Sequence, residues 1–492
     1  MTFSSLSFLF YFLPAALILY YAFFFSRTLK NLVMLVCSLV FYAWGEPGNF
    51  VLLLVSILVN YLLGLLIGQD RKKSEARFWL IVALLFNIGM LFVFKYLSFV
   101  VQNINAVTGG QISAPSIALP IGISFFTFQA MAYVIDVYRR SVAAQTNLLH
   151  LALYFSFFPK LTQGPIVPYA DFEAQIVQRR ETLQKFSSGM CLLIVGLGKK
   201  VLIANSMAIV ADRVFEIHAM GAIPVSLAWL GAIAYTFQIY FDFSGYSDMA
   251  VGLGLMFGFK LMQNFNYPYV SKSISEFWRR WHISLGAWFR EYVYIPLGGS
   301  RMKNKDLVIR NLAVVWILTG IWHGANWTFL VWGVLNFICI ASERVFGLEK
   351  SSVPGWLRHV YAMFVVIIGW VVFRSDSLQI AGDYIVCMFN PANGFASPYA
   401  AMFLREYGVF FAAALVFSMP VAPVINSFLA KGILLRQSVS AQPPYEVKSV
   451  YTQAPLGALV NVLYVAGIIA LFLVCTAYLV KGSYSPFIYF QF

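Results

Sequence analysis

Long apolar runs separated by short polar gaps make up most of the chain. A helix that crosses the ~30 Å hydrocarbon core of a bilayer needs ~20 mainly apolar residues. Several runs reach that length, and the shorter ones are typical of half-spanning or re-entrant segments packed within protein. The pattern predicts an all-α polytopic membrane protein with about eleven to thirteen helices across or within the membrane. The runs are 6–25, 31–44, 50–67, 78–101, 123–137, 189–204, 223–243, 312–322, 327–340, 359–373, 407–424 and 459–480.

Composition supports a lipid environment. Hydrophobic residues make up 60% of the chain and charged residues only 11%, whereas soluble domains have about 45–50% and about 25%. Too few charged side chains are present to cover so much apolar surface, which excludes a soluble globule. The five cysteines lie singly in apolar stretches, with neither a CxxC pair nor the spacing of a disulfide framework.

The positive charges lie in the gaps between the apolar runs. The net charge of +14 is therefore not gathered on one face, as nucleic-acid binding would require. Basic gaps at Arg27 and Lys30, at 70–77 and at Arg139 and Arg140 alternate with gaps that lack Lys and Arg. The positive-inside rule then places the N-terminus outside and the basic gaps in the cytoplasm. The first run lacks the basic start of a secretory signal, so we expect it to remain as a membrane helix.

One segment departs from the apolar pattern. Residues 261–310 contain eight Lys and Arg against three Asp and Glu. Aromatic and aliphatic residues recur there at spacings of three and four, which predicts one amphipathic helix at the cytoplasmic interface, ended by the Pro296-Leu297-Gly298-Gly299 stretch. Its basic residues fit an interfacial anchor that binds anionic lipid headgroups. The recurring residues are Phe277, Trp278, Trp281, Leu285, Trp288 and Phe289, and His282 lies among them.

A second unusual segment, WILTGIWHGANWT at 316–328, places His323 and Asn326 at the end of an apolar run. A charged group inside a membrane helix costs at least ~2.5–3.5 kcal/mol. A neutral imidazole avoids much of that cost and can accept a proton, which suits a general base. A hydrogen-bonding bridge between helices is the alternative for His323, and simple exposure at the headgroup level is the alternative for His282.

Three other polar groups have weaker interpretations. Asp242 and Asp248 follow a long run, where a turn with Asp248 capping the next helix is favoured over a catalytic carboxylate pair. Lys199 and Lys200 lie outside any phosphate-loop motif but could meet phosphate through charge. Two histidines without a third ligand predict no metal site. A polar set in run 123–137 either lines a tunnel or joins helices by hydrogen bonds: Ser124, Thr127, Gln129, Asp136 and Tyr138.

The motifs RRWHISLGAWFREYVYIPLGG at 279–299 and WILTGIWHGANWT resemble those of the membrane-bound O-acyltransferase superfamily. Within it, the chain is similar to the bacterial branch that contains the membrane subunit of alginate O-acetylation. The resemblance implies a single membrane domain, 1–492, with helices arranged in a ring around a central tunnel. Its parts would be N-terminal helices at 1–118, a catalytic core at 119–345 and C-terminal helices at 346–492. The resemblance extends through LPIGISFFTFQAMAYVIDVYR (119–139), FPKLTQGPIV (158–167), YFDFSGYSDMAVGLGLMFGF (240–259), NFNYPYVSKSISEFWRRWHISL (264–285) and SYSPFIYFQF (483–492).

The same resemblance implies transfer of acetyl from a cytoplasmic donor, acetyl-CoA, to a polysaccharide outside the bacterial inner membrane. The acetyl group would go to the glycan directly or through a periplasmic partner acetyltransferase, and no cofactor would stay bound. Alginate is the expected acceptor. Segments 389–398 and near 437 look less like the alginate members, and cellulose and peptidoglycan acetylation systems use similar subunits, so these acceptors stay open.

Residue roles follow from the chemistry and the motif match together. The resemblance makes His323 the essential residue and His282 its companion. As a base that removes the acceptor proton, His323 would supply about 10²–10⁴-fold in rate, and His282 would orient the donor or relay a proton. Asn326 would polarise the carbonyl as an oxyanion donor. A channel or proton-coupled transporter is the alternative, against which the lack of visible repeats counts. The expected substrate-binding and donor-binding residues are Asn326, Trp322, Arg279, Arg280, Lys272 and Trp281.

Overall fold

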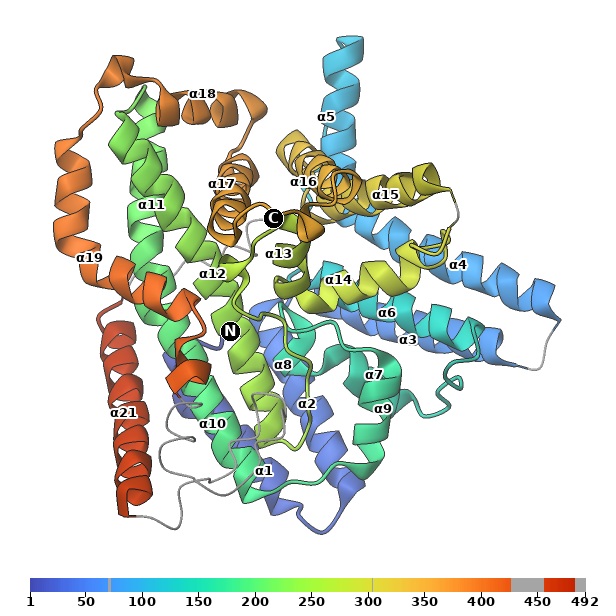
Figure 1. Cartoon of the computed structure of the whole chain (residues 1–492). Coiled ribbons are helices and arrows are strands. Elements are labelled where there is room, and N and C mark those ends of the chain that lie inside the picture. Colours follow the sequence, from blue (N-terminus) through green and yellow to red (C-terminus); the bar gives the residue numbers. More distant parts are fainter. Residues whose placement is uncertain (70–71, 303, 426–454, 483–492) are drawn as a thin grey trace.

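The computed structural model describes residues 1–69, 72–302, 304–425 and 455–482, and the regular secondary structure in these ranges is all helical, with no strand (Figure 1). This confirms an all-α protein. The predicted tail motif at 483–492 and the segment near 437 lie outside the described residues. The α-helices are α1 (Leu13–Ala22), α2 (Arg27–Gly45), α3 (Phe50–Gly68), α4 (Lys73–Leu91), α5 (Leu97–Thr108), α6 (Ile123–Tyr138), α7 (Leu148–Ser156), α8 (Phe158–Leu161), α9 (Tyr169–Gln178), α10 (Leu183–Gly198), α11 (Asn205–Met220), α12 (Val225–Met256), α13 (Ile274–Arg280), α14 (Ile283–Phe289), α15 (Lys305–His323), α16 (Trp327–Val345), α17 (Gly355–Arg374), α18 (Leu378–Phe389), α19 (Pro398–Ser418) and α21 (Pro455–Val480).

Short segments with a different helical pitch join or interrupt these helices. Wide π turns occur at η1 (Phe8–Phe12), η2 (Phe92–Tyr96), η3 (Lys199–Ala204) and η5 (Arg290–Tyr294), and 3₁₀ turns at η4 (Pro268–Val270), η6 (Leu348–Lys350) and η7 (Pro391–Asn393). Two of the π turns lie inside long continuous helices, at η2 and η3. Such insertions are frequent at functional sites.

Nine helices in the described part of the chain are long and apolar enough to cross a membrane, which confirms a polytopic membrane protein. They are 27–45, 50–68, 73–108, 183–220, 305–323, 327–345, 355–374, 398–418 and 459–480. Three shorter apolar helices, Phe8–Ala22, Ile123–Tyr138 and Leu378–Phe389, accompany them.

The most extensive contact between two helices is that of α10 with α12, which lie side by side in Figure 1. A Cβ at Gly252 would lie 2.5 Å from the Gly189 carbonyl oxygen, and one at Gly245 would lie 2.8 Å from the Gly196 carbonyl oxygen. The backbones therefore approach as closely as glycine allows, as in other membrane helix pairs with small residues at the contact.

The predicted turn at Asp248 is wrong, because α12 runs unbroken for 32 residues through it. Asp242 pairs with Lys200 at 2.5 Å, and Asp248 pairs with Lys199 at 2.6 Å. These pairs neutralise the carboxylates without ending the helix. Both lysines thus pair with carboxylates of α12, and a phosphate contact through charge stays a prediction.

The single amphipathic helix predicted across Phe277 and Trp288 is also wrong. It is broken into α13 and α14 at His282, whose backbone is left-handed, with φ of 44°. The irregular segment beside the break takes over its backbone bonds, since Ile283 N–H donates to the Asn264 carbonyl at 3.0 Å. The aromatic residues of the predicted helix are buried or half-buried in the protein.

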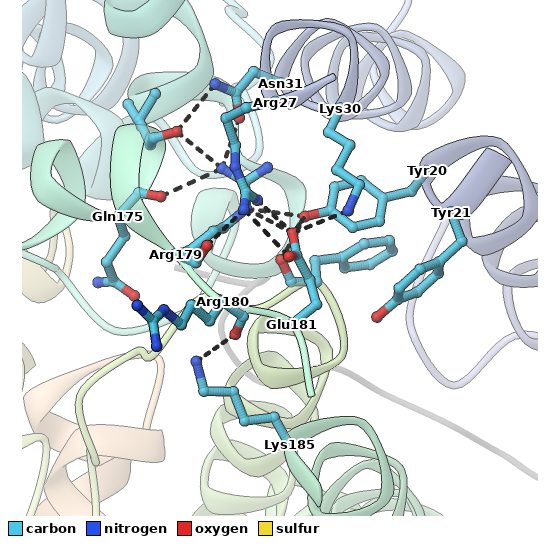
Figure 2. Close-up of polar contacts among 12 residues, drawn as sticks. Tyr20, Tyr21, Arg27, Lys30, Asn31, Gln175, Arg179, Arg180, Glu181 and Lys185 are labelled. Carbon is cyan, nitrogen blue, oxygen red and sulfur yellow. Dashed lines mark hydrogen bonds and ion pairs between the residues drawn. The ribbon is translucent and has the colours of Figure 1, made fainter. Parts of the chain in front are cut away.

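A buried polar cluster ties α1 and α2 to the turn between α9 and α10 (Figure 2). Glu181 accepts hydrogen bonds from Arg27 and, at 2.6 Å, from the Tyr20 hydroxyl. Arg179 donates to Asn31 Oδ1 at 2.6 Å. Burial by itself would raise the pKa of Glu181, but the hydrogen bonds from Arg27 and Tyr20 outweigh it and lower that pKa to about 2.

Candidate active site

His323 is the last residue of α15 and is only 5% exposed. Its ring lies 5.0 Å from the Trp332 ring and 5.2 Å from the Phe373 ring, edge-on in both cases. The next residue, Gly324, has no room for a side chain, because a Cβ there would overlap the Phe329 ring. The aromatic walls and the bare glycine fix the imidazole at the point where α15 ends.

His282 is held in one tautomer by Asn264. Asn264 Oδ1 accepts hydrogen bonds from Ser284 N–H at 3.1 Å and Ser284 Oγ at 2.9 Å, so this atom is the oxygen of the amide. His282 Nδ1 lies 3.1 Å from the same oxygen and must donate to it. His282 Nε2 is then an acceptor, and it has no hydrogen-bond partner among the described residues. Burial lowers the pKa of His282 to about 3, which keeps the ring neutral.

Trp322 lies against both imidazoles. Its ring is 6.0 Å from His282 and 5.0 Å from His323, centre to centre. The structure therefore brings together three of the residues singled out from sequence, although His282 and His323 come from separate elements and are 41 positions apart.

Two cavities lie at the end of α15, and His282 lines neither of them. The first, of about 40 Å³, is lined by His323, Trp322 and the hydroxyl-bearing Ser124 and Thr162. The second, of about 400 Å³, is more polar and begins where the first ends. The two share Lys95 and Leu119, and the second is also lined by Ser98, Tyr235, Asn326, Arg374 and Asp376.

Asn326 belongs to the second cavity and also caps α16. Its Oδ1 accepts from Thr328 N–H at 3.1 Å, and its Nδ2 donates to the Asp376 carbonyl at 2.8 Å. The side chain thus joins the start of α16 to the end of α17. This use leaves one N–H of the amide for any contact with a substrate.

The residues expected to bind a donor lie elsewhere. Arg279 and Arg280 are at the end of α13, where they pair with Glu349 at 2.6 Å and Glu276 at 2.9 Å. Trp281 is buried among aromatic rings, 5.0 Å from Trp370, and lines neither cavity.

Lys272 lies beside Gly355 at the first residue of α17, whereas Arg374 at its last residue lines the second cavity. A helix of 20 residues is ~30 Å long. The basic group around Lys272 and the second cavity are therefore separated by about the thickness of a bilayer core.

The polar set on α6 divides into two kinds. Ser124 lines the first cavity. Gln129 accepts from the buried Lys160, and Asp136 Oδ2 accepts from the Tyr292 hydroxyl at 2.8 Å. The helix-joining alternative therefore holds for Gln129 and Asp136, whereas Ser124 lines a cavity and the tunnel stays a prediction.

Sequence reasoning missed Lys95 and Asn264. Lys95 is a lysine inside an apolar run, which is itself a signal of a functional site in a membrane protein. Asn264 gave no signal, because its role depends on the fold of the segment beside the break at His282. Among the described residues, no group of three His, Cys, Asp or Glu side chains is arranged to hold a metal ion.

Comparison with known proteins defines the class. Residues 123–375 match the membrane-bound O-acyltransferase family, and this range contains both histidines and Trp322. The chain belongs to that family and is an O-acyltransferase.

Its relatives act on different acceptors. The chain is 39% identical, over the full length of both proteins, to a probable alginate O-acetylase of Azotobacter vinelandii. It is 35% identical to a peptidoglycan O-acetyltransferase of Helicobacter pylori over 76% of this chain and 77% of that protein. It is 29% identical to a teichoic acid D-alanyltransferase of Bacillus subtilis over 46% and 59%.

Proposed function

We propose that this protein transfers acetyl from a cytoplasmic thioester, acetyl-CoA, to a hydroxyl on a polysaccharide outside the inner membrane of a bacterium. The observation that carries the proposal is the buried His323 at the wall of a small cavity, together with the buried His282, whose ring lies 6.0 Å from that of Trp322, the residue before His323. Full-length similarity to an alginate O-acetylase favours alginate as the acceptor.

His323 acts as the general base. A thioester is already activated, so the main task is to position the acceptor hydroxyl and remove its proton. The hydroxyl oxygen attacks the carbonyl carbon, the C–S bond breaks, and the proton passes through His323 to the departing sulfur. His282, whose Nε2 is a buried acceptor, orients the donor or relays the proton. The remaining N–H of Asn326 polarises the carbonyl.

The two sides of the membrane have different roles. The basic group of Lys272, Arg279 and Arg280 attracts the phosphates of the donor from the cytoplasm. Since both arginines already pair with glutamates, this attraction works through charge rather than through dedicated contacts. The second cavity, about one α17 length away, admits the acceptor and completes the tunnel. The acetyl group leaves onto the polysaccharide or onto a periplasmic partner acetyltransferase.

The test is transfer by the purified protein in liposomes, with radiolabelled acetyl-CoA and alginate oligosaccharide. His323→Ala should lower ester-linked acetate by about 10²–10⁴-fold, the share of rate that a general base supplies. His150→Ala, on α7 and outside both cavities, is the matched control and should transfer like the parent protein. Full transfer by a correctly inserted His323→Ala protein would contradict the assignment.

The same liposomes separate the alternatives. Peptidoglycan fragments or cellulose oligosaccharides replace alginate to identify the acceptor, and similarity to a peptidoglycan O-acetyltransferase makes the first comparison specific. A transporter would move a solute across the bilayer without forming an ester, and that result would remove the acetyltransferase proposal.

A further inference from the structure

A lysine from the N-terminal third of the chain reaches the end of the helix that carries His323. Lys95 Nζ donates hydrogen bonds to the carbonyl oxygens of Trp322 at 2.6 Å and His323 at 3.0 Å. The neighbouring Tyr96 hydroxyl donates to the Ile321 carbonyl at 2.8 Å. These carbonyls belong to the last turn of α15, which lacks intrahelical partners. The turn is therefore held by two residues of η2, which extends the 73–108 helix through a π turn.

Two features of this position interact favourably with an ammonium group. The C-terminal end of a helix carries partial negative charge, and Lys95 Nζ also lies 5.8 Å from the centre of the Trp322 ring, within range of a cation–π contact. No described carboxylate forms an ion pair with Lys95. Its positive charge is balanced only by dipoles and is available to an anionic group beside it.

The ammonium also has a donor to spare. An ammonium carries three N–H groups, and the two carbonyls use two of them. Lys95 lines both cavities, together with His323 on one side and Asn326 on the other. It is thus the charged side chain common to the two cavities. The third N–H can reach a molecule that passes from one to the other.

We propose that Lys95 is a catalytic residue whose free N–H donates to the carbonyl oxygen of the acetyl thioester. This inference rests on the proposed function. When the acceptor oxygen attacks, negative charge develops on that carbonyl oxygen, and a fixed cation in a site without bulk water stabilises it strongly. Lys95 gives up no proton in this step. The hydroxyl proton goes to His323, and the electron pair of the broken C–S bond goes to sulfur.

The alternative role for Lys95 is purely structural, as a cap on α15. The two roles differ in what they predict for Tyr96, which caps the same turn but lines neither cavity. Tyr96→Phe removes one capping hydrogen bond and leaves the charge in place. It is therefore the matched control for a loss of capping alone.

The experiment compares Lys95→Met, Lys95→Gln and Tyr96→Phe in liposomes with acetyl-CoA and alginate oligosaccharide. We expect Lys95→Met to lower kcat by about 10²–10³-fold, as loss of one oxyanion donor does, with KM for acetyl-CoA unchanged. Lys95→Gln keeps two N–H donors for the carbonyls and should fold like the parent while losing kcat. Tyr96→Phe should keep a kcat within a few-fold of the parent.

Two results would overturn the proposal. One is a Lys95→Gln protein that keeps the kcat of the parent. The other is a loss of activity in Lys95→Met that merely parallels its loss of thermal stability and matches Tyr96→Phe. Lys95→Gln also decides the question if Lys95→Met does not fold. Failure of the parent protein to transfer acetyl would instead refute the proposed function, so the two failures are distinguishable.

Discussion

At the residue scale, a single amide oxygen determines which nitrogen of His282 carries the proton. Asn264 Oδ1 accepts from His282 Nδ1 and from two donors of Ser284, all in a fully buried setting. Because three donors depend on it, this oxygen fixes the imidazole and also closes the break between α13 and α14. The position of His282 is thus as much a property of Asn264 as of the histidine itself.

Asn264→Ala should therefore destabilise the protein and lower its activity together. The change leaves buried donors without an acceptor, and one such group costs about 1–3 kcal/mol. Thermal unfolding in detergent measures the first effect, and acetyl transfer the second. Ser284→Ala removes one of the three donors and leaves the bond to His282 intact, so it should retain most of the activity. Equal behaviour of the two variants would show that His282 does not depend on the amide.

The sequence could reveal the two histidines but not their surroundings. His323 is conspicuous as an imidazole in an apolar run, because ionisable groups are costly in lipid. Lys95 carries the same signal, yet its partners are carbonyls of residues 227 and 228 positions away. Backbone acceptors have no residue type of their own, so no sequence pattern could identify them.

At the element scale, the turn between α15 and α16 depends on the absence of a side chain. A Cβ on Gly324 would overlap the Phe329 ring. That ring packs 4.9 Å from Phe373, which in turn lies 5.2 Å from His323. Any displacement of Phe329 is therefore passed to the imidazole through one intermediate ring.

Gly324→Ala should lower both thermal stability and acetyl transfer. Overpacking of a filled core costs about 1–3 kcal/mol, and the ring that moves adjoins the candidate base. Gly408→Ala in α19 is the control, since a Cβ at Gly408 would have no atom within 4 Å and alanine favours a helix there. A Gly324→Ala protein as stable and active as the control variant would contradict this account of the turn.

Helices could be predicted from sequence where the length and hydropathy of one continuous segment determine them. The apolar runs gave the nine long helices, because length and hydropathy are local properties. Two predictions about elements, the single helix across His282 and the turn at Asp248, were wrong for opposite reasons. The break at His282 is set by a distant segment around Asn264 while the aromatic spacing continues across it. Helix α12 continues past its two carboxylates, Asp242 and Asp248, which pair with the two lysines of η3.

At the scale of the whole molecule, the N-terminal helices join the rest through polar contacts as well as apolar packing. The cluster around Glu181 connects α1, α2 and the turn before α10 (Figure 2). Since the pKa of Glu181 is lowered to about 2, the folded protein favours its ionised form. The stabilisation is complete above the ordinary glutamate pKa of about 4.3. It is lost as pH falls from there toward about 2.

Glu181→Gln should therefore lower the melting temperature at pH 7, and the difference from the parent should shrink as pH falls below about 4.3. Thermal unfolding in detergent over this pH range measures it. Glu216→Gln is the control, because Glu216 pairs with Arg213 at an exposed site where ion pairs contribute little. A difference that stays constant from pH 7 to pH 3 would rule out Glu181 as its source.

The hydrogen bonds from Lys95 to the end of α15 have a consequence for hybrids between proteins of this family. The matched family region begins at residue 123, whereas the lysine that holds the end of α15 is residue 95. Exchange of the first 118 residues for those of another acyltransferase would thus replace the lysine that lines both cavities without touching the matched family region. We expect a working hybrid to need a replacement segment that carries a lysine or arginine of its own at the π turn η2.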